Sequence, residues 1–348
     1  MKKFDYSFLD NGLLPANLIN LTGLIYSLKT GAEIRKDEYE KIFTELEKIA
    51  KVQSVKSSNE IEGIVTSDER IKQIVNQSSE PLNHNELEIA GYRDALNEIH
   101  LNYENIDFSE ETILRLHEIM MFYTGNENSG KYKTDNNLII EQDEEGKRKV
   151  RFKPVSAKET PKAMEQLVLA YIDASNNSNI NQLLLIPCVI LDFLCIHPFK
   201  DGNGRISRLL SLLLLYKNGF DAGKYISFEE QINNSKGYYH ETLKESSISW
   251  DTNENTYIPF IQNFLSTLYL CYKELDKRFN VVNSNKITKK ARIEATVLNS
   301  LVPVSKAEVC NILPDVSPTT VELVLGNMVR DEKIKIIGKG KNTKYIRK

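Results

Sequence analysis

The sequence predicts a mainly α-helical protein that carries one β-hairpin among its helices and a separate basic unit at its C-terminal end. Its 348 residues exceed what one hydrophobic core usually fills, so two or more domains are expected. Apolar residues recur at helical spacing through the first 280 residues. Residues 281–348 contain 13 Lys and Arg against 6 Asp and Glu, although the whole chain has a net charge of -3.

Helices are expected where apolar residues return every three to four positions. This spacing is seen in residues 37–52, through Ile42, Phe43, Leu46 and Ile49. It predicts further helices over residues 86–99, 110–121, 161–173, 205–217 and 257–279. Residues 182–196 are apolar nearly all round, which places their helix at the centre of a bundle.

One stretch departs from the helical pattern. Two short apolar runs, at 137–140 and 149–152, flank a polar segment that contains Gly146. This arrangement predicts a β-hairpin inserted among the helices. The short polar stretch 280–285 is interpreted as a linker to the basic unit.

The basic unit has the element order of a winged helix-turn-helix. A helix is expected over residues 288–301. Ser305 and Glu308 form a capping box at the start of a short helix that runs to residue 313. Ser317, followed by Pro318, begins another helix that runs to residue 330. Two β-like runs complete the segment, at 333–337 and 343–346.

Composition argues against a membrane or secreted protein. The longest apolar runs, such as residues 209–216, are far too short to span a bilayer. The N-terminal residues MKKFD lack the apolar stretch of a signal peptide. The cysteines and the five histidines lack zinc-ligand spacing. A cytoplasmic protein with no membrane partner is therefore expected.

The residues that carry chemistry are concentrated at 197–208, in the segment HPFKDGNGRISR between two apolar helices. Gly202 and Gly204 allow the backbone to approach a ligand closely. A helix that begins at about Asn203 turns its free N–H groups and its dipole toward this loop, which suits an anion.

The charged residues of this segment suit a nucleotide. Arg205 and Arg208 lie three residues apart, on one face of the helix, where two guanidinium groups suit a polyphosphate. Asp201 is a carboxylate suited to a Mg²⁺ ion shared with phosphates. His197 is the nearby side chain whose pKa suits proton abstraction at neutral pH. Together they point to attack on a nucleotide phosphate.

The segment resembles the motif of the Fic family, H-P-F-x-[D/E]-G-N-G-R-x-x-R, at every defined position. The resemblance implies a protein adenylyltransferase that moves AMP from ATP to a Ser, Thr or Tyr hydroxyl of a target protein or of itself. It implies that His197 deprotonates the hydroxyl and that Asp201 holds Mg²⁺. Pyrophosphate then leaves, and AMP stays on the protein.

The same resemblance assigns the remaining phosphate contacts. It implies an anion hole formed by the backbone of Gly202, Asn203 and Gly204, with the Asn203 side chain also on phosphate. It implies contacts from Arg205 and Arg208 to the β- and γ-phosphates.

Other stretches extend the resemblance over about residues 10–280. The hairpin 137–152 resembles the family's flap, which aligns the backbone of a target protein by strand addition. Residues 130–133 look like the G-x-[FY]-R stretch before the flap, but Lys133 replaces the arginine, which puts that contact in doubt. Residues 232–239 resemble the wall of the adenine pocket, and imply Asn234, Tyr238 and Tyr239 as its residues.

An inhibitory motif precedes the catalytic residues. Ser58, Glu62 and Gly63 match the family pattern [S/T]-x-x-x-E-[G/N]. Gly63 suits a helix C-cap, and a carboxylate at Glu62 opposes the helix dipole and needs a cationic partner. Arg208 is the expected partner, and their pairing would bind ATP unproductively. His117 also matches a family position, where a buried, hydrogen-bonded histidine is favoured over a catalytic one.

Three domains are expected: an N-terminal helical region at 1–100 with the inhibitory helix, a Fic catalytic domain at 101–280, and a winged-helix domain at 286–348. The helix 318–330 is poor in base-reading groups, and the basic residues cluster in the wing, at Lys333, Lys335, Lys339, Lys341 and Lys344. The wing therefore favours phosphate contacts over sequence reading. DNA and a protein partner both remain open for this domain.

Two alternatives to a simple transferase stay open. One is a nucleotide-sensing, DNA-binding transcriptional regulator, although the intact His197 favours an enzyme because binding alone needs no base. The other is removal of AMP, with Glu62 orienting a water molecule. Many relatives form dimers, so a homodimer is a further expectation.

Overall fold

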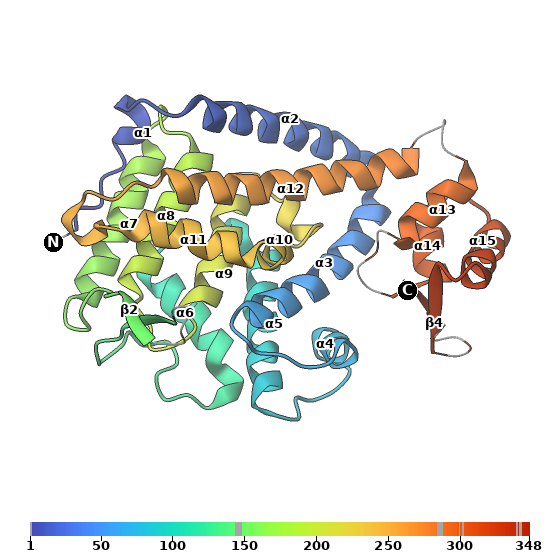
Figure 1. The fold of residues 1–348 in the computed structure, drawn as a ribbon, viewed down its shortest axis with the longest axis horizontal. Coiled ribbons are helices and arrows are strands. Elements are labelled where there is room, and N and C mark those ends of the chain that lie inside the picture. Colours follow the sequence, from blue (N-terminus) through green and yellow to red (C-terminus); the bar gives the residue numbers. More distant parts are fainter. Residues whose placement is uncertain are drawn as a thin grey trace.

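A computed structural model describes residues 2–142, 148–283, 288–298, 300, 303–338, 340 and 343–348. The chain forms an elongated helical body with a smaller unit at one end, and the N-terminus lies at the opposite end (Figure 1). The body contains α1 (Phe8–Asn11), α2 (Ala16–Glu38), α3 (Glu40–Ile61), α4 (Asp68–Val75), α5 (His84–Asn102), α6 (Glu110–Met121), α7 (Thr160–Asn176), α8 (Gln182–Ile196), α9 (Asn203–Lys217), α10 (Phe228–Asn234), α11 (Lys236–Ser247) and α12 (Ile258–Asn283). The mainly α class predicted from the sequence is confirmed.

The helices α8 and α9 form the centre of the body. Every residue of α8 from Leu183 to Ile196 is buried, and α9 is buried from Arg205 to Tyr216. Helices α5, α6, α7, α11 and α12 pack around this pair. The all-round apolar sequence of α8 explains this position, because each of its faces needs an apolar neighbour.

The long helices α2 and α12 lie side by side along the body (Figure 1). The sequence pattern did not predict a helix at residues 16–38, where α2 lies. The helix predicted from residue 37 begins at Glu40. Tyr39 separates the two helices with φ -130° and ψ 41°, outside the helical region. Several apolar residues of α2 face solvent, including Ile19, Leu24 and Ile34. This scatter hides the helical period in the sequence.

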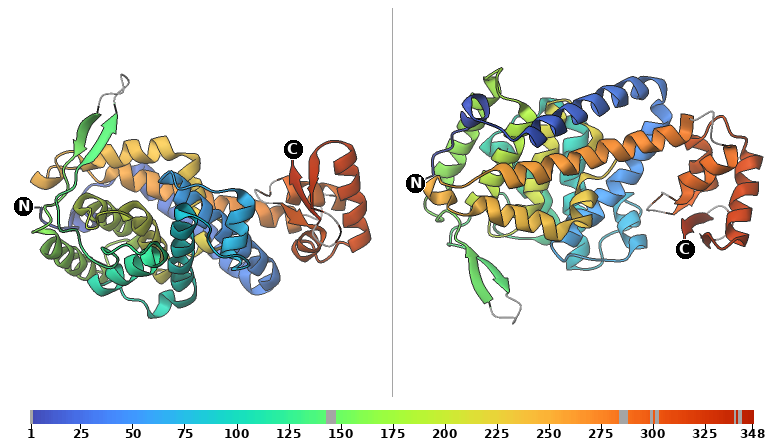
Figure 2. Two further views of the ribbon diagram at one scale, coloured as in Figure 1. Left: turned by 90° about the horizontal axis from the view of Figure 1, so that it is seen from below. Right: turned by 45° about the horizontal axis from the view of Figure 1, so that its top comes forward.

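The hairpin consists of β1 (Ile139–Gln142) and β2 (Arg148–Phe152), which pair antiparallel. Ile140 lies opposite Val150, and Glu141 lies opposite Lys149. The hairpin projects from the body in both views of Figure 2. The expected Gly146 turn lies outside the described residues.

The C-terminal unit contains α13 (Lys289–Leu298), β3 (Val304–Ser305), α14 (Lys306–Ile312), α15 (Pro318–Arg330), β4 (Ile334–Ile337) and β5 (Lys344–Arg347). The strands form one antiparallel sheet in the order β3-β5-β4. The capping box of Ser305 and Glu308 and the cap at Ser317 both form. The short strand β3 was not expected. The predicted linker 280–285 is wrong over residues 280–283, because α12 continues to Asn283.

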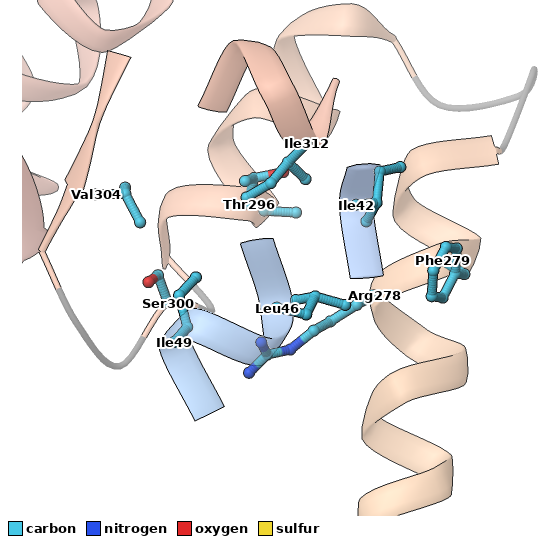
Figure 3. Close-up of a pocket in the computed structure, with 10 residues that line it drawn as sticks. Ile42, Leu46, Ile49, Arg278, Phe279, Thr296, Ser300, Val304 and Ile312 are labelled. Atoms are coloured by element: carbon cyan, nitrogen blue, oxygen red, sulfur yellow. The ribbon is translucent and has the colours of Figure 1, made fainter. Parts of the chain in front are cut away.

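The C-terminal unit packs on the first half of α3 through α14. A small, mostly apolar cavity lies between α3, the end of α12 and this unit (Figure 3). Leu46 and Ile49 of α3 line one wall, and Val304 and Ile312 line another. The helix that ends at the inhibitory motif therefore contacts the C-terminal unit along its first half.

Candidate active site

The loop that joins α8 to α9 is held in a strained but well-supported conformation. His197 ends α8 with φ 53° and ψ 60°, in the left-handed region. Gly202 precedes α9 with φ 80°. The Asn203 side chain accepts from the Phe199 backbone N–H at 2.9 Å and donates to the Phe199 carbonyl at 2.8 Å. Asn203 therefore uses its side chain to brace the loop.

His197 is in the protonation state that a general base requires. Its Nδ1 lies 3.3 Å from the Leu194 carbonyl, which can only accept, so Nδ1 carries the proton and Nε2 has a free lone pair. Burial, together with the positive charges of Lys133 and Arg151, lowers the pKa of His197 to about 4. The imidazole is therefore neutral at physiological pH.

Lys133 supports the backbone on which His197 sits. Its ammonium donates to the carbonyls of Ile196 and His197, at 3.1 and 2.9 Å, and to Oδ1 of Asn137 at 2.9 Å. Burial lowers the pKa of Lys133 to about 8, so the group remains charged at neutral pH. A lysine in place of the family's arginine therefore still reaches the end of α8. Lys133 also connects the catalytic loop to Asn137, which lies just before β1.

The first turn of α9 faces Glu62. A side-chain carbon at Gly204 would collide with the Glu62 carboxylate, so a larger residue there would displace the carboxylate from this position. Arg208 Nη2 pairs with Glu62 Oε1 at 2.8 Å. The same guanidinium donates to the Ser58 hydroxyl and carbonyl, each at 2.8 Å. Arg208 is thus fully engaged by the end of α3, and the ion pair expected between Glu62 and Arg208 is present.

Two residues from the α10–α11 region hold the end of α3. Asn233 donates to Glu60 Oε2 at 3.0 Å, and Lys236 donates to the Ile61 carbonyl at 2.5 Å. Glu62 lies one residue beyond α3, and Gly63 follows with φ 80°, as a C-cap requires. The end of α3 is therefore anchored by the α10–α11 region as well as by Arg208.

Arg205 is paired with carboxylates rather than open to solvent. Its Nη1 lies 2.6 Å from Glu88 Oε2 on α5, and its Nη2 lies 3.6 Å from Asp201 Oδ2. Only 1% of its side chain is exposed, whereas 66% of Asp201 is exposed. Arg205 therefore orients the loop and Asp201 in this arrangement. Glu88 has no counterpart among the expected site residues, because it lies more than 100 positions away in the sequence.

His117 packs beneath the loop. Its ring stacks on Phe199, with centroids 3.8 Å apart and planes within 3°. Its Nδ1 accepts from the Gly130 N–H at 3.0 Å, and its Nε2 donates to the Asp201 carbonyl at 3.2 Å. Burial lowers the pKa of His117 to about 4. This neutral ring, which makes two hydrogen bonds, fits the buried structural histidine that the sequence favoured.

Part of the site opens onto one cavity. The motif loop and α9 contribute His197, Gly204 and Arg208, and Glu62 lies beside them. The other walls come from the hairpin and α11, through Leu138, Ile139, Arg151, Phe152, Tyr239, His240, Leu243 and Ser247.

The adenine-pocket residues expected from the sequence are only partly brought together. Tyr239 lines the cavity and is 6% exposed. Tyr238 is 48% exposed, and neither it nor Asn234 lines the cavity. Arg151 and His240 do line it but were not expected. A basic residue on a hairpin and a histidine beside a tyrosine give no local signal of a site.

The residues present suit Mg²⁺ only together with a ligand. Among the described residues, no group of three or more His, Cys, Asp or Glu side chains could hold a metal ion. Asp201 has one oxygen that accepts from the Gly202 N–H at 2.6 Å, and its other oxygen faces outward near Arg205. Mg²⁺ is commonly held by one or two carboxylates plus substrate phosphates. Asp201 fits that pattern.

Several lysines of the C-terminal unit are paired with acidic residues. Lys333 lies 3.2 Å from Glu294, and Lys344 lies 3.4 Å from Glu308. These pairs offset part of the positive charge on which DNA binding by the wing would depend. Lys339 and Lys341 lie outside the described residues.

Comparison with known proteins agrees with this arrangement. Residues 107–215 match the Fic/DOC family. A Fic family protein from Desulfovibrio desulfuricans G20 has the same fold, with a TM-score of 0.63 at 19% identity over 97% of each chain. A Fic domain containing signaling protein from Bacteroides thetaiotaomicron VPI-5482 aligns with a TM-score of 0.56 at 21% identity, over 74% of this chain and 94% of its own.

Fic-1 from C. elegans aligns with a TM-score of 0.54 at 17% identity, over 74% of each chain. No curated protein matches the sequence. No helix in the described part of the chain combines the length and apolar composition that a membrane span needs. The family match covers α6 to α9 and includes His197, Gly204 and Arg208. The chain therefore contains a Fic/DOC family domain, which spans residues 107–215 and holds the loop of the candidate active site.

Proposed function

We propose that this protein is an adenylyltransferase that moves AMP from ATP to a hydroxyl group of a target protein and of itself. The main observation in support is that three features line one cavity: the neutral His197, the N-terminus of α9 at Gly204, and the buried Arg208. A base, an anion-binding helix end and a guanidinium group are what attack on a nucleotide phosphate requires.

In the proposed reaction, His197 Nε2 takes the proton of a Ser, Thr or Tyr hydroxyl. The hydroxyl oxygen forms a bond to the α-phosphorus of ATP, and the bond from that phosphorus to the bridging oxygen breaks. Pyrophosphate leaves with the electron pair, and AMP remains on the protein. The N–H groups at the start of α9 stabilise the charge on the phosphate oxygens. A Mg²⁺ ion at Asp201 would neutralise charge on the α- and β-phosphates.

Glu62 is proposed to inhibit this reaction. Arg208 would contact the terminal phosphate of ATP in a productive complex. In the present arrangement Arg208 is bound to Glu62 and Ser58, and the Glu62 carboxylate lies against Gly204. The negative charge of Glu62 beside Gly204 would repel the phosphates of ATP, and its ion pair with Arg208 would occupy the position of the terminal phosphate.

The hairpin is proposed to dock the target. Ile140 and Val150 lie opposite each other and are more than half exposed, so this face offers apolar contacts and strand pairing to a target segment. A hydroxyl carried on that segment would approach the cavity beside His197.

Labelling with α-³²P ATP and Mg²⁺ tests the proposal. Wild type, Glu62→Gly and Glu62→Gly/His197→Ala are compared for incorporation of label into the protein itself and into a bacterial lysate. We expect label to rise at least tenfold with the first change, because Arg208 is released, and to vanish with the second. Incubating labelled protein with wild type then measures removal of AMP.

Two outcomes would contradict the proposal. Label that survives His197→Ala would exclude His197 as the base. Absence of label in every variant, with ATP binding still measurable by calorimetry, would favour the nucleotide-sensing regulator instead. In that case a mobility-shift assay with duplex DNA would be the next measurement.

A further inference from the structure

The candidate active-site cavity contains one positive charge that no neighbour balances. Its charged lining residues are Glu62, Arg208 and Arg151. Glu62 and Arg208 neutralise each other through their ion pair at 2.8 Å. Burial lowers the pKa of both lining histidines, His197 and His240, so neither adds a charge at neutral pH. The cavity as it stands therefore carries the charge of Arg151.

The alternation of β2 turns Arg151 toward the cavity. Successive side chains of a strand point to opposite faces. Val150 is 57% exposed on the outer face, and its partner across the hairpin, Ile140, is 54% exposed on the same face. Arg151 is on the inner face, where it lines the cavity with Cys195 and Tyr239. Val150 and Arg151 therefore lie on opposite faces of β2.

Arg151 is partly buried, and one donor of its guanidinium group lacks a partner among the described residues. Its Nε is buried and makes no hydrogen bond within the part of the chain that the structure describes. The nearby carboxylate, Glu141, is instead held by Lys244 at 2.8 Å and Lys149 at 3.2 Å. A desolvated guanidinium is costly unless an anion pairs with it. The missing partner is therefore expected to be an anionic ligand.

We infer that Arg151 binds a phosphate group of the nucleotide, from the part of the cavity wall that the hairpin forms. The inference rests on the proposed function for the nature of the ligand. The phosphate would lie between two positive features: the free N–H groups at Gly204 and the Arg151 guanidinium. His197 lines the same cavity, so the phosphate held there is within the space that the base serves. A guanidinium suits this position because it donates two parallel hydrogen bonds to phosphate oxygens.

The position of Arg151 connects nucleotide binding to target docking. Val150 and Arg151 are adjacent on one short strand, so a target that pairs with the hairpin also fixes the guanidinium. A bound phosphate would in turn order the hairpin before a target arrives. Arg151 is thus a substrate-positioning residue, distinct from Arg208, that remains available while Glu62 holds Arg208.

Binding to the full-length protein tests this inference. Isothermal titration with AMP, inorganic pyrophosphate and adenosine is compared between wild type, Arg151→Gln and Arg151→Lys. Lys153→Gln is the matched control, because it removes the same charge two residues further along from an exposed side chain. We expect Arg151→Gln to weaken AMP and pyrophosphate about tenfold. Arg151→Lys keeps the charge but loses the two parallel hydrogen bonds, so its affinity should fall between those of wild type and Arg151→Gln, and adenosine should be unaffected throughout.

A second measurement separates a contact in the site from a fold defect. The charge of Arg151 lowers the pKa of His197, so Arg151→Gln should raise the pKa of His197 in an NMR titration of its ring proton. Arg151→Met also removes the charge but keeps the aliphatic stem. It replaces Arg151→Gln in this measurement if that variant unfolds the hairpin, and it should raise the pKa of His197 in the same way. Lys153→Gln should leave the titration of His197 unchanged.

The outcomes are distinguishable from those for the proposed function. Equal affinity of wild type and Arg151→Gln for AMP and pyrophosphate would overturn the role of Arg151, even if labelling with ATP succeeds. Loss of anion affinity in Arg151→Gln would support it, even if no label is transferred. A wild-type protein that binds none of the three probes would overturn both the proposed function and the role of Arg151. An equal loss of affinity in Lys153→Gln would overturn the role of Arg151 alone.

Discussion

At the scale of single residues, the geometry of His197 depends on a side chain 64 positions away. His197 holds a left-handed backbone conformation, which is costly for a residue with a β-carbon. Lys133 stabilises that conformation by donating to the carbonyls of Ile196 and His197. The end of α8 also carries the negative pole of the helix dipole, where a cation is favourable.

Lys133→Met should impair transfer without removing ATP binding. The variant keeps the aliphatic stem but leaves two buried carbonyls without donors, so the imidazole loses its fixed position. A displacement of about 1 Å can cost about 100-fold in rate. We expect kcat to fall by that order in the Glu62→Gly background, with the KM for ATP little changed. Lys133→Arg should retain activity, and equal loss in both variants would argue against the donor role.

The pH dependence of transfer should report the buried state of His197. A general base must be unprotonated, so activity is lost as pH falls through its pKa. Because burial lowers that pKa to about 4, the acid limb should lie near pH 4 and not near the ordinary value of 6.5. Initial rates between pH 4 and 8 in the Glu62→Gly variant measure it. A limb near 6.5 would show that the ring is hydrated during the reaction.

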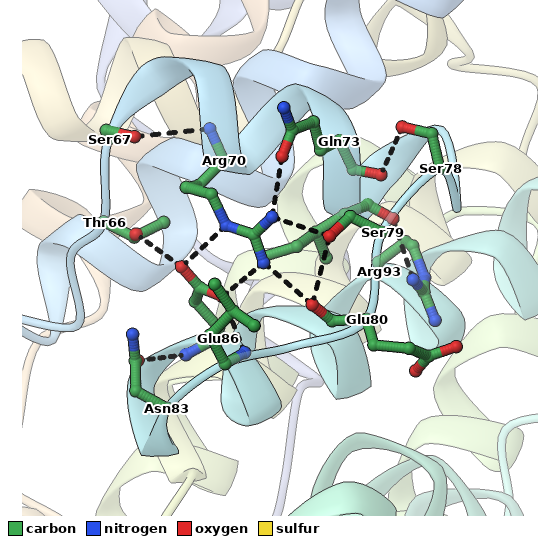
Figure 4. Close-up of polar contacts among 12 residues, drawn as sticks. Thr66, Ser67, Arg70, Gln73, Ser78, Ser79, Glu80, Asn83, Glu86 and Arg93 are labelled. Carbon is green, nitrogen blue, oxygen red and sulfur yellow. Dashed lines mark hydrogen bonds and ion pairs between the residues drawn. The ribbon is translucent and has the colours of Figure 1, made fainter.

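At the scale of elements, α3 connects the active site to two other parts of the molecule. Its first half packs against the C-terminal unit, and its end carries Ser58 and leads to Glu62. The segment after Glu62 is held by a polar cluster centred on Arg70 of α4 and Glu86 of α5 (Figure 4). Glu86 is 2% exposed and pairs with Arg70 through both oxygens, at 3.1 and 2.7 Å.

Arg70→Met should destabilise the fold and loosen the inhibitory contact. It removes charge-assisted hydrogen bonds to a buried carboxylate, which predicts a loss of about 2–3 kcal/mol in the free energy of unfolding. Because α4 begins at Asp68, a short segment after Glu62, transfer should also rise severalfold. Urea unfolding and ATP labelling measure the two effects. Arg115→Met is the control, since this side chain is 61% exposed and its ion pair with Glu98 should contribute little. Similar losses in both variants would refute the special role of Arg70.

At the scale of the whole molecule, buried histidines connect the core to acid stability. Burial lowers the pKa of His100 to about 3 and of His117 and His197 to about 4. In the unfolded chain the same groups titrate near 6.5. The unfolded state therefore binds more protons than the folded state between about pH 6.5 and 4, and stability falls as pH decreases through this window.

Each buried histidine should contribute a slope of up to about 1.4 kcal/mol per pH unit in that window. Urea unfolding at pH 7 and pH 5 measures it. His100→Gln should lose less stability on acidification than wild type, because one titrating group is gone. His84→Gln, with a side chain that is 69% exposed, should behave like wild type. Equal pH dependence in all three proteins would show that carboxylates govern the loss.

The sequence alone determined the local features of this protein. Helix α8 follows from an apolar run, α14 from its capping box, and the hairpin from two short apolar runs. The loop at 197–208 could be interpreted because its chemical groups lie within twelve residues. These features depend on contacts between neighbours in the chain, and the sequence records such contacts directly.

Only the tertiary structure decided how charges are paired across the site. Glu88 reaches Arg205 from α5, Arg151 enters the cavity from β2, and Tyr239 lines it while Tyr238 does not. These contacts depend on how the helices and the hairpin pack. The sequence contains many other Glu, Arg and Tyr residues that could make the same contacts, and it does not distinguish among them. The partner of a buried charge is chosen by proximity in space, because only a contact at about 3 Å offsets the cost of removing that charge from water.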